Sequence, residues 1–219
     1  MVTFNINQLT GHEPVELHSQ IPLFNEAAVA FLNMKSQAEK EGISFQIFSG
    51  YRSYEDQKKI WEKKVEKLRE TILRPEKRVE KILEFSAIPG TSRHHYGTDV
   101  DIVGMAKAPG EDPLLAENYV EPSGVYHKIF LWLLKYSFRY GFQIAYSKDP
   151  SRGGFQYEPW HFSYAPLSKP FLASYLKQNW QSHIRASELS DGVVLQSQFL
   201  RQYELQFLLG VHLSLLPGQ

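Results

Sequence analysis

The chain has 219 residues, no cysteine, and equal numbers of basic and acidic side chains, 24 of each. This length is typical of one domain, and we expect residues 1–219 to form a single domain with a C-terminal helical extension at 186–219. The zero net charge argues against a nucleic acid partner. The absence of cysteine excludes a cysteine nucleophile and thiolate-bound metal, so any transition metal must be held by nitrogen and oxygen ligands.

The first ten residues lack a basic stretch followed by an apolar one, so no secretory signal is visible. No apolar run reaches the roughly 18 residues of a bilayer span, and we therefore expect no transmembrane segment. We expect a cytoplasmic protein, or a periplasmic one if an export signal has been removed. Nothing in the sequence predicts an oligomeric state.

The first half of the chain predicts helices around one short strand. A helix is expected from about Asn25 to just before Gly42, since glycine is a common helix stop. Alternating apolar and polar residues predict a strand over 43–48. After a turn at 49–52, a helix capped by Ser53 is expected to run through a Lys- and Glu-rich stretch. That helix ends near Leu73, and a short helix follows over 76–84.

The second half predicts short strands at 98–103, 142–146 and 156–164. The Pro- and Gly-containing segment 107–124 is expected to be a loop, either a lid or specificity loop or a plain surface connection. Apolar residues over 125–140 predict a helix, Ser168 is expected to cap another, and a last helix is expected between Gly192 and Leu209. This irregular alternation favours an α+β fold with a small, mainly antiparallel sheet flanked by helices.

Residues 92–101, Ser-Arg-His-His-Tyr-Gly-Thr-Asp-Val-Asp, concentrate groups that bind metals. A hydrolytic zinc site needs three protein ligands and one open position for water. Gly97 allows the bend that brings His94 and Asp101 together. Strand alternation places Asp99 and Asp101 on one face, where a cation would relieve the repulsion between the two carboxylates. The alternative is an exposed strand edge with two solvated carboxylates.

A second segment, Tyr-Glu-Pro-Trp-His-Phe at 157–162, adds a glutamate three residues before a histidine. This spacing can place Glu158 as a general base beside a water molecule activated by a metal, with His161 as a further ligand. Pro159 fixes the local turn and Trp160 can pack beneath it. The alternative is a strand with a core tryptophan and a hydrogen-bonded histidine. Together the two segments supply the His, Asp, His and Glu that a catalytic zinc site requires.

The pattern Ser-x-His-x-x-Gly-x-x-x-Asp followed by Glu-x-Trp-His resembles the signature of the D-alanyl-D-alanine carboxypeptidase and dipeptidase family. That family includes the vancomycin-resistance carboxypeptidases and belongs with the hedgehog and lysostaphin-type peptidases. The run Ser-Gly-Tyr-Arg-Ser at 49–53, with Gln57, also resembles the family's upstream motif. The matches extend over residues 49–161 in the family's order, so the resemblance implies a hedgehog or D-Ala-D-Ala metallopeptidase-like fold.

The resemblance also implies roles for individual residues. Three zinc ligands of the family match His94, Asp101 and His161. The family's catalytic base matches Glu158. Arg52 matches an arginine that binds the substrate or steadies the developing oxyanion.

Three further residues are expected near the substrate. Ser92 matches a serine that lines the site, and Gln57 belongs to the upstream motif. Asp99 stands where many members of the family have alanine, and we expect it either to orient a metal ligand from behind or to bind a substrate amine. His95 is not expected to be a metal ligand.

The resemblance therefore implies a zinc carboxypeptidase that removes the terminal D-alanine of peptidoglycan-derived peptides, with Glu158 as general base. Three related activities are alternatives: L,D-carboxypeptidase, D-Ala-D-Ala dipeptidase and endolysin-like peptidoglycan endopeptidase. A hedgehog-like zinc-containing binding module is the non-enzymatic alternative. The presence of Glu158 argues against it, because a pure binding module has no need of a base.

Overall fold

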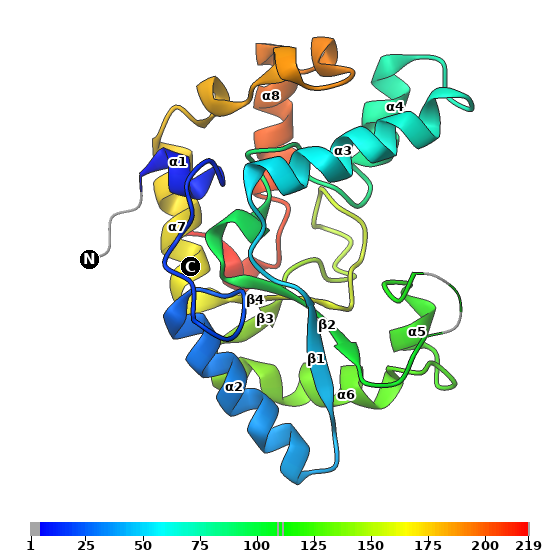
Figure 1. Ribbon diagram of the computed structural model, residues 1–219, viewed down its shortest axis with the longest axis vertical. Coiled ribbons are helices and arrows are strands. Elements are labelled where there is room, and N and C mark those ends of the chain that lie inside the picture. Colours follow the sequence, from blue (N-terminus) through cyan, green and yellow to red (C-terminus); the bar gives the residue numbers. More distant parts are fainter. Residues whose placement is uncertain (1–4, 109, 111, 219) are drawn as a thin grey trace.

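A four-stranded sheet lies at the centre of the computed structural model, which describes residues 5–108, 110 and 112–218 (Figure 1). Its strands follow the order β1-β2-β4-β3, and each described pair is antiparallel. They span Phe45–Ser49 (β1), Asp99–Gly104 (β2), Phe142–Ile144 (β3) and His161–Tyr164 (β4). The predicted α+β fold with a small antiparallel sheet flanked by helices is therefore confirmed.

The strand register already brings the site together. Asp101 of β2 pairs with His161 of β4, and on its other side Asp101 pairs with Ser49 of β1. A register shift between Ile47 and Ser49 interrupts the β1–β2 ladder at this point. Such irregularities re-aim side chains next to functional sites, and here the shift lies at the end of β1 that faces the site.

Helices α2 (Asn25–Lys40) and α6 (His127–Tyr136) pack against the lower part of the sheet in Figure 1. Their apolar side chains join those of the strands in one core, which contains Phe31, Ile102 and Leu133. Because side chains alternate along a strand, Val100 and Ile102 enter this core while Asp99 and Asp101 point to the other face, as the sequence predicts.

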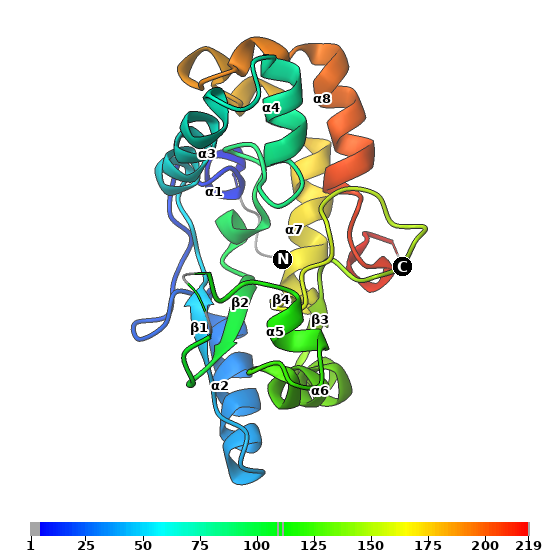
Figure 2. The same cartoon turned by 90° about the vertical axis from the view of Figure 1, so that its right-hand side faces the viewer.

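A second core lies above the sheet in Figures 1 and 2. It is built by α3 (Tyr54–Arg69), α4 (Pro75–Ile82), α7 (Ala165–Lys177) and α8 (Ser197–Tyr203). Trp61 of α3 and Tyr203 of α8 are both buried in it. The C-terminal segment therefore packs into the same core as the helix that follows the upstream motif.

Shorter helical elements connect these parts. They are α1 (Ile6–Leu9), α5 (Glu117–Val120), the 3-10 turns η1 (Arg93–Tyr96), η2 (Ser137–Tyr140), η3 (Trp180–His183), η4 (Ala186–Glu188), η5 (Gly192–Val194) and η7 (Leu213–Leu215), and the π turn η6 (Glu204–Leu208). No helix within the described residues is long and apolar enough to cross a membrane.

Three element predictions differ most from the structure. The strand expected over 156–164 is limited to β4, because Pro159 has no amide proton to donate to a ladder. The helix expected to be capped by Ser168 begins at Ala165 instead, with a proline in its first turn, where that residue is favoured. The single helix expected between Gly192 and Leu209 is a 3-10 turn, then α8, then a π turn. The extension at 186–219 is thus only partly helical.

Candidate active site

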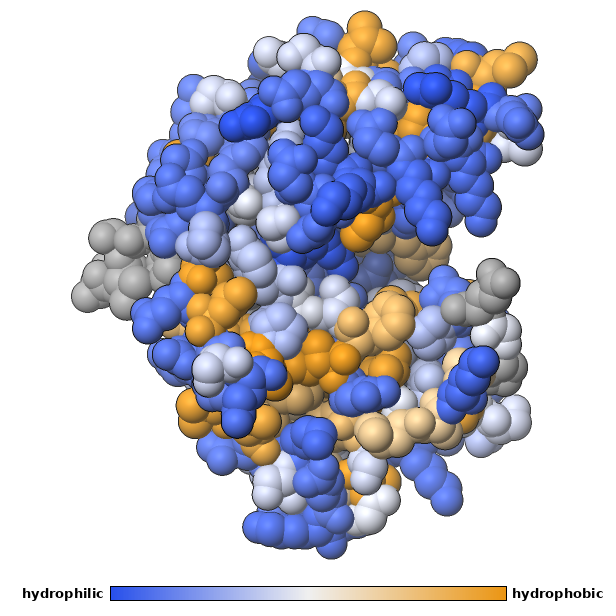
Figure 3. All heavy atoms as spheres, viewed as in Figure 1, coloured by the Kyte–Doolittle hydropathy of each residue, from blue (hydrophilic) through white to orange (hydrophobic). Residues whose placement is uncertain are grey.

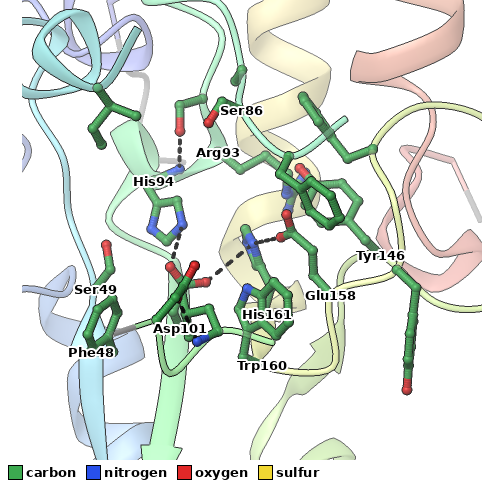
Figure 4. A pocket seen from close by; sticks show the side chains of 18 of the residues that line it. Phe48, Ser49, Ser86, Arg93, His94, Asp101, Tyr146, Glu158, Trp160 and His161 are labelled. Atoms are coloured by element: carbon green, nitrogen blue, oxygen red, sulfur yellow. Dashed lines mark hydrogen bonds and ion pairs between the residues drawn. The ribbon is translucent and has the colours of Figure 1, made fainter. Parts of the chain in front are cut away.

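Three separate elements bring two histidines and one aspartate into a buried cluster (Figure 4). His94 comes from η1, Asp101 from β2, and His161 is the first residue of β4. His94 Nε2 lies 3.4 Å from Asp101 Oδ2, and His161 Nδ1 lies 3.5 Å from Asp101 Oδ1. One ligand atom from each residue lies within 4.8 Å of the others. The cluster is therefore compact enough for one metal ion.

The turn before β2 places His94. Ser92 caps η1, because its Oγ accepts a hydrogen bond from the His94 amide at 3.3 Å. Gly97 ends the turn with a φ of 67°, a left-handed conformation that glycine adopts without steric cost. A Cβ at this position would lie 3.0 Å from Val15 Cγ2. The chain can therefore reverse into β2 here, as the sequence predicts for Gly97.

Hydrogen bonds on the far side of each imidazole orient the rings. Nδ1 of His94 donates to the Gly50 carbonyl at 2.8 Å, because that oxygen can only accept. This leaves Nε2 facing the cluster. Nε2 of His161 lies 3.0 Å from Asp99 Oδ2, which leaves Nδ1 facing the cluster. Such outer hydrogen bonds fix the tautomer and the orientation of metal-binding histidines.

Asp99 belongs to a fully buried polar network behind His161. Its carboxylate accepts from Arg93 Nε at 2.8 Å, from Ser163 Oγ at 2.7 Å and from Thr98 Oγ1 at 2.9 Å. Burial opposes ionisation, but Arg93 and His161 hold the pKa of Asp99 below its usual range. Asp99 does not line the cleft. These contacts fit the expected role in which Asp99 orients the metal ligand His161, whereas the alternative contact with a substrate amine stays a prediction.

The donor set fits a cation. Asp101 Oδ1 is buried and has no hydrogen-bond partner among the described residues. Burial raises the pKa of Asp101 to about 6. Burial opposes protonation of His161, but hydrogen bonds to Asp99 and Glu158 outweigh it and raise the pKa of His161 to about 10. Asp101 and His161 therefore tend to hold protons, and a metal ion that binds to the cluster would displace these protons. Two imidazoles and one carboxylate form a donor set of hydrolytic zinc sites.

Glu158 stands at the edge of this cluster and lines the cleft. Its Oε2 lies 3.0 Å from His161 Nδ1, and Figure 4 shows the carboxylate approaching His161 from the side away from His94. The amide of Glu158 donates to the Tyr146 carbonyl at 3.1 Å, which anchors this segment beside β3. A carboxylate in this position can accept a proton from a water molecule held at the cluster.

Arg52 lines the cleft and is held by neutral oxygens. Nη1 donates to Gln57 Oε1 at 2.7 Å and Nη2 donates to Ser49 Oγ at 2.8 Å. Gln57 also donates to the Ala87 carbonyl at 2.8 Å and is only 1% exposed. Gln57 is not among the residues that line the cleft, and its expected contact with substrate stays a prediction. Its side chain holds Arg52 in place.

His95 is fully buried and engaged on both ring nitrogens. Nδ1 donates to the Arg52 carbonyl at 2.7 Å, and Nε2 accepts from the Gly90 amide at 3.1 Å. Burial lowers the pKa of His95 to about 3. The prediction that His95 is not a metal ligand agrees with these contacts, which join the segment before α3 to the turn before η1.

The cluster lies in a cleft of about 720 Å³. Figure 3 shows the molecule hollowed between its hydrophilic upper part and its more apolar lower part. Ser92 lines this cleft, as expected. The sequence did not single out Lys64, Ser86 or Tyr146, which line it too, because their places depend on how α3 and the loops meet.

The loop expected over 107–124 contributes one wall of the cleft. Residues 112 and 114–117 line it, and α5 forms the end of the loop. Pro109 and Glu111, which the expected loop includes, lie outside the described residues. Because this loop forms part of the cleft wall, the structure favours the interpretation of a lid or specificity loop over that of a plain surface connection.

A buried trio of potential metal ligands beside a further carboxylate, open to a cleft, is an arrangement found in metal-dependent hydrolases. The chain belongs to the VanY family of D-alanyl-D-alanine carboxypeptidases, whose pattern matches residues 20–167. Among curated proteins, it is 30% identical over 135 residues to the bifunctional D-Ala-D-Ala dipeptidase and D-Ala-D-Ala carboxypeptidase VanXYC of Enterococcus gallinarum. It is 29% identical over 153 residues to a D-alanyl-D-alanine carboxypeptidase of Enterococcus faecium.

These alignments cover 61% and 69% of this chain but only 62% and 40% of the two relatives. Among solved structures, VanYB in complex with D-Alanine-D-Alanine superposes with a TM-score of 0.54 at 21% identity, over 77% of this chain and 86% of that one. A mutant VanY from the VanB-type resistance cassette, in complex with Zn(II), gives a TM-score of 0.54 at 22% identity, over 78% and 88%. Similarity at this level shows a shared fold.

Proposed function

We propose that the protein is a zinc-dependent carboxypeptidase that removes the terminal D-alanine of peptidoglycan-derived peptides. The observation that carries the proposal is the His94–Asp101–His161 cluster, with Glu158 Oε2 3.0 Å from one of its ligand atoms at the floor of a cleft. Membership of the D-alanyl-D-alanine carboxypeptidase family supports the choice of bond and substrate.

Zinc held by His94, Asp101 and His161 would supply a Lewis acid that acidifies a water molecule and polarises the scissile carbonyl. Glu158 accepts the proton of the attacking water and then delivers it to the leaving amine. Arg52 offers the cleft a guanidinium without a carboxylate partner within the described residues. It is suited to hold the terminal carboxylate of the substrate in a charge-assisted hydrogen bond.

Dipeptidase activity on free D-Ala-D-Ala is the second candidate, because VanXYC carries both activities in its name. The cleft of about 720 Å³ lies within the usual range of about 300–1,000 Å³ for ligand pockets, so it has room for a substrate longer than the dipeptide. L,D-carboxypeptidase and endopeptidase activities remain candidates of the same chemistry. A hedgehog-like zinc-containing binding module is disfavoured by Glu158.

A panel of substrates tests the choice. The zinc-loaded protein is incubated with a pentapeptide ending in D-Ala-D-Ala, a tetrapeptide ending in one D-Ala, free D-Ala-D-Ala and a cross-linked peptide. We expect D-alanine release to be fastest from the pentapeptide. Faster cleavage of any other substrate would replace the proposed activity by the corresponding alternative. Binding without cleavage of any of them would favour the binding module.

A further inference from the structure

Besides Arg52, a second positively charged side chain, Lys64, lines the cleft that contains the His94–Asp101–His161 cluster. It belongs to α3, between Trp61 and Val65, which are both fully buried. These two anchors hold the helix so that the partly buried Lys64 side chain reaches the cleft. Its ammonium donates to Ser86 Oγ at 2.6 Å.

Within the described part of the chain, no carboxylate lies within ion-pair distance of Lys64. Two other lysines of the same helix do have such partners: Lys58 pairs with Glu188 at 3.4 Å, and Lys59 pairs with Asp56 at 2.8 Å. Burial lowers the pKa of Lys64, so its charged form is disfavoured by its surroundings. An ammonium withdrawn from water without a counter-charge costs free energy, which an anionic ligand would recover.

Arg52 shares this property, since neutral oxygens of Gln57 and Ser49 hold its guanidinium. The cleft thus offers two cations without paired carboxylates. The acidic side chains of Asp112 and Glu117 line it from the loop before α6, but both are exposed. Asp101 and Glu158 lie close to His161. Glu158 acts on Lys64 and Arg52, and Asp101 acts on Arg52, only from beyond ion-pair distance. The two cations are therefore available to two separate anionic groups of one ligand.

We propose that Lys64 is a specificity residue that binds a second carboxylate of the peptide substrate, upstream of the bond that is cut. This inference rests on the proposed function, in which Arg52 takes the terminal carboxylate. The Arg52 guanidinium is held by Gln57, and Lys64 lies seven residues beyond Gln57 on α3, about 10 Å along the helix at 1.5 Å per residue. An extended peptide covers that distance in about three residues. The second carboxylate therefore belongs to one of the residues that precede the terminal one.

The test uses pairs of synthetic peptides ending in D-Ala-D-Ala that differ only in glutamate or glutamine at the second, third or fourth position upstream of the cleaved bond. Both kcat/KM for D-alanine release and the calorimetric Kd are measured for the zinc-loaded protein. We expect the protein to prefer glutamate over glutamine about 10-fold or more at one of these positions. The Lys64→Met variant should reduce that ratio to about one, and Lys64→Arg should retain it.

Lys63→Met is the matched control, because Lys63 is the exposed neighbour on the same helix and its loss removes the same charge. That variant should keep the preference of the unmodified protein. Equal binding of both peptides of every pair, or a preference that survives in a folded Lys64→Met protein, would overturn the inference. The Kd ratios decide the role of Lys64 even if no peptide is cleaved. Absence of cleavage together with a Lys64-dependent Kd ratio would overturn only the proposed function.

Discussion

At the scale of single residues, the buried carboxylate of Asp99 decides which nitrogen of His161 faces the cluster. Its hydrogen bond to Nε2 leaves Nδ1 directed toward Asp101. Arg93 in turn holds Asp99 with a bond of 2.8 Å from Nε. A chain of two buried charges therefore stands behind one ligand atom of His161.

Replacing Asp99 by asparagine removes the negative charge and leaves Arg93 buried without its counter-ion. Because groups behind metal ligands contribute about 10–100-fold to metal affinity, we expect the zinc affinity of Asp99→Asn to fall by about that factor. Competition with a chromogenic chelator measures it. Asp112→Asn, an exposed acid of the cleft wall, serves as the control and should bind zinc normally. Unchanged affinity in a folded Asp99→Asn protein would contradict the role assigned to Asp99.

Glu158 is assigned to proton transfer and not to metal binding. General base catalysis contributes about 10²–10⁴-fold, so Glu158→Ala should lose activity on that scale while it retains zinc. Steady-state kinetics and elemental analysis of the same preparation measure both quantities. Glu117→Ala, on the exposed wall of the cleft, should keep most of its activity. A folded Glu158→Ala protein with near-full activity would exclude Glu158 as the base.

At the scale of elements, the segment after α7 braces the helices that border the cleft. Arg78 of α4 donates two hydrogen bonds of 2.6 Å to Asp191 and others to the carbonyls of Ile72 and Leu73. The side chains of this ion pair are only 9% and 8% exposed. Tyr203 of α8 lies 2.7 Å from Thr91 Oγ1, just before the turn that carries His94.

The Asp191→Asn variant tests this brace. Asparagine tolerates the left-handed φ of 58° at this position, so the substitution changes the charge and not the backbone. We expect a lower Tm, because the Arg78 guanidinium is left largely buried without its counter-charge. Glu80→Gln, which breaks the exposed Lys77–Glu80 pair, should change Tm much less. Equal effects of the two variants in thermal unfolding would argue against a stabilising brace.

The elements themselves were predictable where one periodicity dominates. The spacing of apolar residues predicts α2 and α6, and the Asp-Val-Asp-Ile alternation predicts β2 with its carboxylates on the site face. The segment after Gly192 was not predictable, because 3-10 and π turns have no fixed apolar period and Asp191 adopts a left-handed conformation. Its packing is determined by partners far away in the chain.

At the scale of the whole molecule, the order of the motifs predicted the metal cluster better than any single motif did. His94, Asp101 and His161 come from three elements that only the β2–β4 register brings together. The sequence could not show the roles of Gln57 and Asp99, because these roles depend on both side chains being buried behind the site. The role of Lys64 was not evident from the sequence, because it belongs to a charged run of several lysines, of which Lys58 and Lys59 form ion pairs.

In the proposed function, the His94–Asp101–His161 cluster binds a zinc ion on which peptide hydrolysis depends. The most direct measurement follows D-alanine release from a pentapeptide ending in D-Ala-D-Ala by the purified protein, by the protein stripped with a chelator, and by the stripped protein resupplied with zinc. We expect that stripping abolishes release and that zinc restores it, but not in a folded His161→Ala variant. Undiminished release by a protein that elemental analysis shows to be free of metal would exclude a zinc-dependent mechanism.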